Sequence, residues 1–122
     1  MKISLQDISN AIESVKLETN YGEAVRTYAL ELMTDACDQG VENVEDEYSL
    51  ERLCLNGASS LADYNMGGCS LCYTGDIVER LKLRRDISDM DALKHQHIAL
   101  QNAMNLVKIA FKIVKFKNEV SR

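Results

Sequence analysis

Residues 88–117, which read SDMDALKHQHIALQNAMNLVKIAFKIVKFK, decide the fold of this chain. Apolar side chains and one histidine recur along them at gaps of three and four residues, the spacing of one face of an α-helix. The series is Met90, Leu93, His97, Leu100, Met104, Val107, Phe111 and Val114. Ser88 is a suitable N-cap, and Asp91 stands where a capping box usually has glutamate. The stretch therefore predicts one long amphipathic helix over roughly the last thirty residues.

Two arrangements of this long helix fit its regular spacing. It suits a coiled coil with a partner, and it equally suits the central helix of a bundle. Beyond about residue 105 the apolar arc widens to include Leu106, Ile109, Ala110, Ile113 and Phe116. A coiled-coil seam is narrow, whereas a helix covered on two sides has a wide apolar face. The central helix of a bundle is therefore predicted, and a homodimer formed through exposed surface stays the alternative.

The rest of the chain also favours helices, because none of its 122 residues is a proline and β-rich folds usually carry prolines in their turns. A first helix is predicted from Leu5, Ile8, Ile12 and Val15, with Ser4 as its N-cap. A turn at residues 20–22 precedes a second helix over residues 23–38, which Gly40 ends. Shorter helices are predicted near residues 49–55, 60–64 and 77–83. We expect one all-α domain, residues 1–122, in which a small helical bundle of about five to six helices packs around the long C-terminal helix.

Composition and the first residues predict a cytoplasmic protein without a membrane span. The hydrophobic fraction of 46% and the charged fraction of 27% are ordinary for a folded domain. Residues 1–7 are polar and end on Asp7, so they lack the apolar core of a signal peptide. Three lysines interrupt the longest apolar stretch, residues 105–116, which is too polar to cross a membrane. Without export, the four cysteines are expected to be reduced thiols.

The formal net charge of −5 conceals an uneven distribution along the chain. Residues 1–51 carry twelve acidic and three basic side chains, a net of −9. Residues 52–122 carry eleven basic and seven acidic side chains, a net of +4. Such halves either attract each other within the fold or form opposite faces for different partners. Attraction within the fold is the simpler interpretation.

Cys69 and Cys72 form a C-x-x-C pair, a spacing that occurs in zinc knuckles and in redox sites. A structural zinc ion needs four ligands, and the other two cysteines, Cys37 and Cys54, are seventeen residues apart. A redox pair belongs between a strand and a helix of an α/β domain, and no such alternation is visible in this sequence. All four cysteines are therefore interpreted as buried thiols that fill contacts between helices.

The sequence predicts no enzyme, no metal site and no cofactor. The Gly67-Gly68 pair belongs to neither of the glycine-rich patterns that bind phosphates. His95 and His97 are two residues apart, so a helix places them on different faces, and neither pairs with a nucleophile. His97 belongs to the apolar series and is interpreted as a core residue, whereas His95 is expected to be exposed.

Two charged groups are candidate binding surfaces. The acidic group, centred on a connector at residues 42–47, comprises Asp35, Asp38, Glu42, Glu45, Asp46, Glu47 and Glu51. An acidic helical face of this kind is suited to the Arg- and Lys-lined groove of a nucleic-acid-binding protein. The basic group, Lys108, Lys112 and Lys115, follows helical spacing and forms a potential ridge for phosphates. The net charge of −5 and the pI near 5.0 argue against direct nucleic-acid binding.

A central segment resembles a known sequence pattern. The segment contains LNGASS at residues 55–60, DY at 63–64, GGCSL at 67–71, Tyr73, GDI at 75–77 and ERL at 79–81. It resembles uncharacterised small proteins encoded on phages and mobile elements of intestinal bacteria, whose pattern reads roughly LNGAxxWxxYSxGGCxLIYDGDIAERL. Leu61 stands where that family often has an aromatic residue, and Cys72 replaces an apolar residue, which makes the C-x-x-C pair incidental. The resemblance covers residues 55–81. It implies that the chain is encoded on a phage or mobile element, and it identifies no functional residue in this sequence.

These observations favour a non-enzymatic interaction protein of a phage or mobile element. Its expected partner is a protein, such as a host nucleic-acid-binding protein, whose basic groove receives the acidic helical face. Inhibition of a nuclease-based defence system, in the manner of anti-CRISPR proteins, fits the size and acidity of the chain. The alternative is a small helical regulatory or DNA-associated protein, monomeric or dimeric, that uses the ridge of Lys108, Lys112 and Lys115.

Overall fold

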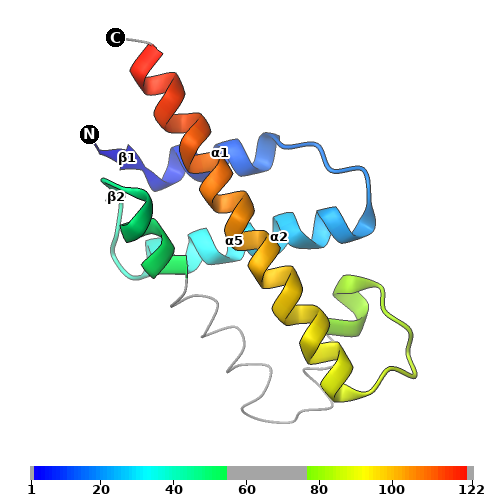
Figure 1. Ribbon diagram of the computed structural model, residues 1–122. Coiled ribbons are helices and arrows are strands. Elements are labelled where there is room, and N and C mark those ends of the chain that lie inside the picture. The colour runs from blue at the N-terminus through cyan, green and yellow to red at the C-terminus, as the bar shows by residue number, and fades with distance from the viewer. Residues whose placement is uncertain (1, 55–76, 121–122) are drawn as a thin grey trace.

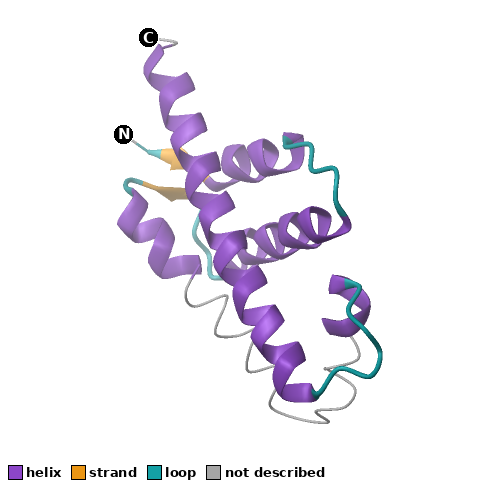
Figure 2. Ribbon diagram, turned by 45° about the vertical axis from the view of Figure 1, so that its right-hand side comes forward, coloured by secondary structure: helices purple, strands orange, loops and turns teal. Residues whose placement is uncertain are grey.

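The computed structural model describes residues 2–54 and 77–120, which are mostly helical (Figure 1, Figure 2). Three helices carry most of the structure: α1, Leu5–Ser14, α2, Asn20–Asp38, and α5, Asp89–Val120. Residues 47–54 and 77–81 are also helical. A small antiparallel sheet pairs β1, Ile3–Ser4, with β2, Asn43–Val44. The predicted helical class is confirmed, and the two-stranded sheet is an addition to it.

Ser4 begins α1, as the sequence predicts. Its hydroxyl oxygen accepts hydrogen bonds from the backbone nitrogens of Gln6 at 3.1 Å and Asp7 at 3.4 Å. These bonds satisfy two of the donors that the start of a helix leaves without a partner. The apolar residues of the helix, Leu5, Ile8 and Ile12, are fully buried, and α1 packs against both α2 and α5.

The second helix begins three residues earlier than predicted, because Thr19 caps it. The Oγ1 atom of Thr19 accepts a hydrogen bond from the backbone nitrogen of Gly22 at 2.9 Å. Residues 20–22, predicted to be a turn before the helix, are therefore its first turn. A Cβ at Gly22 would lie 2.9 Å from the Cβ of Leu17, so the close approach of the preceding loop requires glycine there. The end of α2 agrees with the prediction, since Gly40 follows it with a φ of +85°.

The long helix α5 also begins as predicted. The Oγ atom of Ser88 accepts a hydrogen bond from the backbone nitrogen of Asp91 at 3.2 Å. Both α1 and α2 pack against α5, which runs across them through the molecule (Figure 1). The predicted arrangement of shorter helices around one long C-terminal helix is confirmed. Among the described helices, none has both the length and the apolar character needed to cross a membrane.

The first half of α5 buries only part of the predicted row. Leu100 is buried and Leu93 is half-buried, whereas Met90 is 63% exposed and His97 is exposed as well. The adjacent row, Ala92, Gln96, Ala99 and Ala103, is also buried. Both rows follow the three-and-four spacing of a helix face, and the alanine row allows α1 and α2 to approach closely. The interpretation of His97 as a core residue is therefore wrong, whereas His95 is exposed as expected.

The second half of α5 is covered on one side only. Val107, Phe111 and Val114 are buried. Across the helix, Ile109 is 53% exposed and Phe116 is 66% exposed, and Ile113 is also exposed. The prediction that the wide apolar arc is covered on two sides is therefore wrong. The reason is that α1 and α2 lie on the same side of α5 (Figure 1, Figure 2), and among the described residues no other long helix covers the opposite side.

The acidic connector is more ordered than its composition suggests. Asn43 and Val44 form β2, whose partner strand is the start of the chain. The backbone nitrogen of Leu5 donates a hydrogen bond to the backbone oxygen of Glu42 at 2.9 Å, next to this sheet. Val44 is buried opposite Ile3, which is buried too. A single apolar side chain within the acidic run thus anchors the connector to the core.

Residues 77–81 form a short helix on the side of α2. The predicted helix extended to residue 83, but Lys82 takes a left-handed φ of 55° and ends it.

The predicted helix near residues 60–64, the Gly67-Gly68 pair and the C-x-x-C pair lie outside the described residues. So does all but the end of the segment that resembles phage proteins.

Candidate functional site

The two predicted charged surfaces meet in the folded chain. Helical residues 47–54 lie beside α5, and Glu51 Oε1 is 3.2 Å from Lys108 Nζ. Glu47 Oε1 is 4.0 Å from Lys112 Nζ. These contacts join the acidic first half of the chain to its basic second half, in agreement with the interpretation that the halves attract each other. Since both pairs are partly exposed, each contributes at most about 1 kcal/mol to stability.

Two further acidic residues have local structural roles. Asp46 caps residues 47–54, because its Oδ1 atom accepts a hydrogen bond from the backbone nitrogen of Ser49 at 2.7 Å. The hydrogen bonds from the Ser49 backbone and side chain lower the pKa of Asp46. At the end of α2, Asp35 Oδ2 accepts a hydrogen bond from Gln39 Nε2 at 3.1 Å. Four of the seven predicted acidic residues are thus engaged within their own chain.

The other three acidic residues form what we call the acidic edge: Asp38, Glu42 and Glu45. All three are exposed, and none has an ion pair within the described residues. Asp38 ends α2, whereas Glu42 and Glu45 flank β2. The pairing of β2 with β1 and the Leu5–Glu42 backbone bond fix this segment against the core. The acidic edge is therefore held in place by backbone contacts, with its carboxylates directed to solvent.

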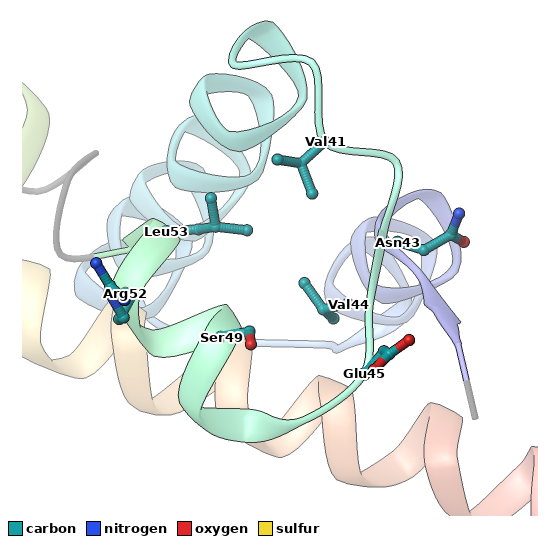
Figure 3. A pocket seen from close by; sticks show the side chains of 7 residues that line it. All are labelled: Val41, Asn43, Val44, Glu45, Ser49, Arg52 and Leu53. Atoms are coloured by element: carbon teal, nitrogen blue, oxygen red, sulfur yellow. The ribbon is translucent and has the colours of Figure 1, made fainter.

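A hollow of about 430 Å³ lies beside the acidic edge (Figure 3). The chain between α2 and β2 forms one wall, and helical residues 47–54 form the other. Val41, Val44 and Leu53 project into it and form an apolar centre, and the polar residues Asn43 and Ser49 also line it. Glu45 and Arg52 stand at its margin. An apolar centre with a polar rim is the usual composition of a small protein-binding site.

Val41 and Leu53 were not among the residues predicted to bind a partner. Val41 is an isolated apolar residue between Gly40 and Glu42, whereas Leu53 is followed by Cys54 and Leu55, and both side chains are half-buried against the core. The available signal was weak, since isolated apolar residues next to charged ones are common on protein surfaces. Only the folding of residues 47–54 back along the connector brings them together.

The lysine ridge is not a row of three unpaired charges. Lys108 and Lys112 contact Glu51 and Glu47, as described above. Only Lys115, which is exposed, has no ion pair in the described part of the chain. A nucleic acid on this ridge would therefore meet two carboxylates beside two of the three lysines.

A second hollow, of about 540 Å³, lies where residues 77–82 meet α2. Arg80 lines this hollow and contacts two side chains of α2. The Arg80 guanidinium carbon is 4.8 Å from the centre of the Tyr28 ring, and Arg80 Nη1 is 2.9 Å from Glu31 Oε2. Burial raises the pKa of Tyr28 despite the opposing charge of Arg80. These contacts hold residues 77–81 against α2, which indicates a structural role for Arg80.

Two of the four cysteines, Cys37 and Cys54, lie in the described residues, and both are free thiols. Cys54 is buried, and burial raises the pKa of its thiol to about 12, which disfavours the nucleophilic thiolate. The buried-thiol interpretation is thus confirmed for Cys54. The buried-thiol interpretation is wrong for Cys37, which is exposed near the end of α2. Ala36, the residue before it, faces the core, and Cys37 lies on the outer side of the helix. Nowhere in residues 2–54 and 77–120 do three or more potential metal ligands converge.

Comparison of this chain with known protein families, with curated proteins and with solved structures finds no match.

Proposed function

We propose that this chain is a non-enzymatic interaction protein that binds a basic protein surface through its acidic edge and the adjoining hollow. The observation that carries this proposal is the contrast between the two charged groups. Within the described residues, the carboxylates of Asp38, Glu42 and Glu45 have no ion pair, whereas two of the three ridge lysines do. Charge that the fold leaves uncompensated and holds in place is available to a partner.

The hollow and the acidic edge supply different parts of such a contact. An apolar side chain of the partner fills the space between Val41, Val44 and Leu53, where burial of apolar area drives association. Arg and Lys residues around that side chain approach Glu42 and Glu45, which steer the encounter and set its orientation. The contact therefore requires a partner surface that is both basic and apolar at its centre.

A groove built for nucleic acid is the partner surface that we favour. Such a groove presents Arg and Lys side chains to phosphates and aromatic or aliphatic side chains to bases. The chain would then exclude nucleic acid by occupying the groove. Inhibition of a nuclease-based defence system of a bacterial host, as anti-CRISPR proteins perform it, is one form of this function. The resemblance of residues 55–81 to phage and mobile-element proteins supports this setting.

The test is capture of basic proteins from a bacterial lysate on the immobilised chain, followed by elution with duplex DNA. We expect at least one nucleic-acid-binding protein to be retained and then displaced by the DNA. The double variant E42K/E45K should reduce its retention by about tenfold or more, because each close charge pair across an interface adds measurable affinity. The matched control E13K/E18K changes the net charge equally at two exposed positions away from the hollow.

An equal loss of retention in both variants would mean that net charge alone causes the effect. That result would contradict a specific role of the acidic edge in binding. Retention that DNA does not displace would argue against a nucleic-acid groove. Direct binding of the purified chain to duplex DNA at physiological salt would favour the lysine ridge, and the variant K108A/K112A should then abolish it.

A further inference from the structure

The C-terminal part of α5 carries a second apolar face that the described residues leave exposed. Ile109, Ile113, Phe116 and Val120 form what we call the outer stripe, and they are 53%, 38%, 66% and 66% exposed. Their gaps of four, three and four residues place them along one side of the helix. Large apolar side chains grouped in this way mark an interaction surface far more often than single exposed ones do.

Part of the outer stripe extends past the rest of the described structure. Nearer the start of α5, on the same side of the helix, Asn102 Nδ2 donates a hydrogen bond to the hydroxyl oxygen of Tyr21 at 2.6 Å, and Ile98 is exposed. Toward the C-terminus, the last turns of α5 extend past β1 and α1 in both views (Figure 1, Figure 2). A second helix can therefore lie along these turns without meeting the body of the protein.

We propose that the outer stripe binds a second copy of this chain, so that two α5 helices pack antiparallel in a symmetric dimer. The spacing of the stripe reads the same in both directions. Reversal of one helix therefore places Ile109 against Val120 of the second copy and Ile113 against Phe116 of the second copy. Each apolar layer is then filled by two different residues, as in antiparallel coiled coils, and the two-fold axis repeats every contact.

The charges beside the stripe agree with the antiparallel direction. Lys112 and Glu119 each stand one residue before a member of the stripe, and so they lie along the same edge of it. In an antiparallel pair this edge meets the identical edge of the second copy, which brings Lys112 of each chain to Glu119 of the other. A parallel pair would instead bring Lys112 toward Lys117 of the second copy, a like charge. Lys112 is able to turn outward, since its side chain is 67% exposed and its contact with Glu47 spans 4.0 Å.

The size of the stripe indicates a weak dimer. A stable interface usually buries about 800 Å² on each partner, and four side chains on three turns of helix supply less than that. We therefore expect a reversible dimer whose population rises with chain concentration. An anionic membrane surface is the main competing occupant, because lysines flank the stripe. The chain's net charge of −5 opposes that attachment.

Sedimentation equilibrium from micromolar to low millimolar chain concentration tests the dimer. The wild-type mass should rise from 13.7 kDa toward twice that value. The variant I113S/F116S should weaken dimerisation by about tenfold or more, because it removes the two central layers. The control Y48S/M90S removes two exposed apolar side chains outside the stripe and should leave the dimer unchanged. Circular dichroism verifies that each variant remains folded.

A charge exchange tests the direction of packing. Either single variant, K112E or E119K, should weaken the antiparallel dimer by roughly twofold to fivefold, and the double variant K112E/E119K should restore it. Strengthening by K112E alone would overturn the antiparallel arrangement, because that result requires Lys112 to face Lys117. The competing occupant is tested with vesicles that contain phosphatidylglycerol.

Three results would overturn the dimer itself. The first is a wild-type mass that stays at 13.7 kDa throughout the concentration range. The second is equal dimerisation by wild type and I113S/F116S. The third is a chain that is monomeric in solution and binds the phosphatidylglycerol vesicles through Ile113 and Phe116. None of these results bears on the acidic edge, which lies on other elements and stands or falls by its own experiment.

Discussion

The buried face of α5 carries smaller side chains than its exposed face. Four of the residues that face the core are alanines: Ala92, Ala99, Ala103 and Ala110. The exposed residues on the other side include three large apolar residues: Ile98, Ile109 and Phe116. Helices approach one another more closely where the side chains between them are small. The buried face also holds larger apolar residues, among them Leu100, Val107 and Phe111, so close packing of small residues acts together with hydrophobicity in selecting the face that α1 and α2 cover.

The two phenylalanines of α5 provide the largest test of this comparison. Phe111 is 3% exposed and Phe116 is 66% exposed. We expect Phe111→Ala to lower the free energy of unfolding by about 3–5 kcal/mol, because it removes a buried ring and leaves a cavity. Phe116→Ala should lower it by less than about 0.5 kcal/mol. Urea unfolding at micromolar chain concentration, where little dimer forms, measures both values. Similar losses in the two variants would contradict the assignment of faces.

The pH dependence of stability tests how well the thiol of Cys54, which lies near Lys108 of α5, is protected from water. Folded Cys54 holds its proton up to about pH 12, whereas its ordinary pKa is 9.0. Between these values the folded chain binds more protons than the unfolded chain, so the free energy of unfolding falls as the pH rises. Below pH 9 the contribution is fully present. The loss across the window is on the order of 4 kcal/mol.

The variant Cys54→Ala isolates this effect from the other groups that titrate at high pH. Its unfolding free energy should fall less steeply than that of the wild type between pH 9 and pH 12, as urea titrations at several pH values would measure. Parallel pH profiles for the two proteins would mean that water reaches the thiol in the folded state.

The smallest expected effect concerns the alanine row itself. Ala103 is fully buried, whereas Asn105, two residues later, is exposed. Ala103→Leu should lower the free energy of unfolding by about 1–3 kcal/mol, because the added methyl groups have no space between the helices. Asn105→Leu is the matched control and should change it by less than about 0.5 kcal/mol. A stabilising Ala103→Leu would show that the row is loosely packed.

Local signals predicted the starts of α1 and α5 and the end of α2. Ser4, Ser88 and Gly40 act as expected, because a cap depends only on residues within one turn of it. The start of α2 was misplaced, since Thr19 and the contact of Gly22 with Leu17 outweigh the turn tendency of residues 20–22. A turn signal of this kind is valid only when no cap precedes it.

The candidate surface was predicted only in part. The acidic residues were identified from their charge, but the sequence could not separate Glu47 and Glu51, which contact lysines, from Glu42 and Glu45, which do not. The division depends on where residues 47–54 lie relative to α5, and this placement involves residues about sixty positions apart. The apolar hollow beside them depends on the same placement.

The helical character of the chain, the amphipathic nature of its last long helix and the opposite net charges of its two halves all follow from the amino-acid sequence. Each of these properties depends on residue type and short-range spacing, which a linear pattern contains in full. Which face of α5 is buried, which charges are paired and where apolar surface stays exposed depend instead on how the helices pack. Two adjacent rows of α5 share the same period, and packing against α1 and α2 is the interaction that distinguishes them.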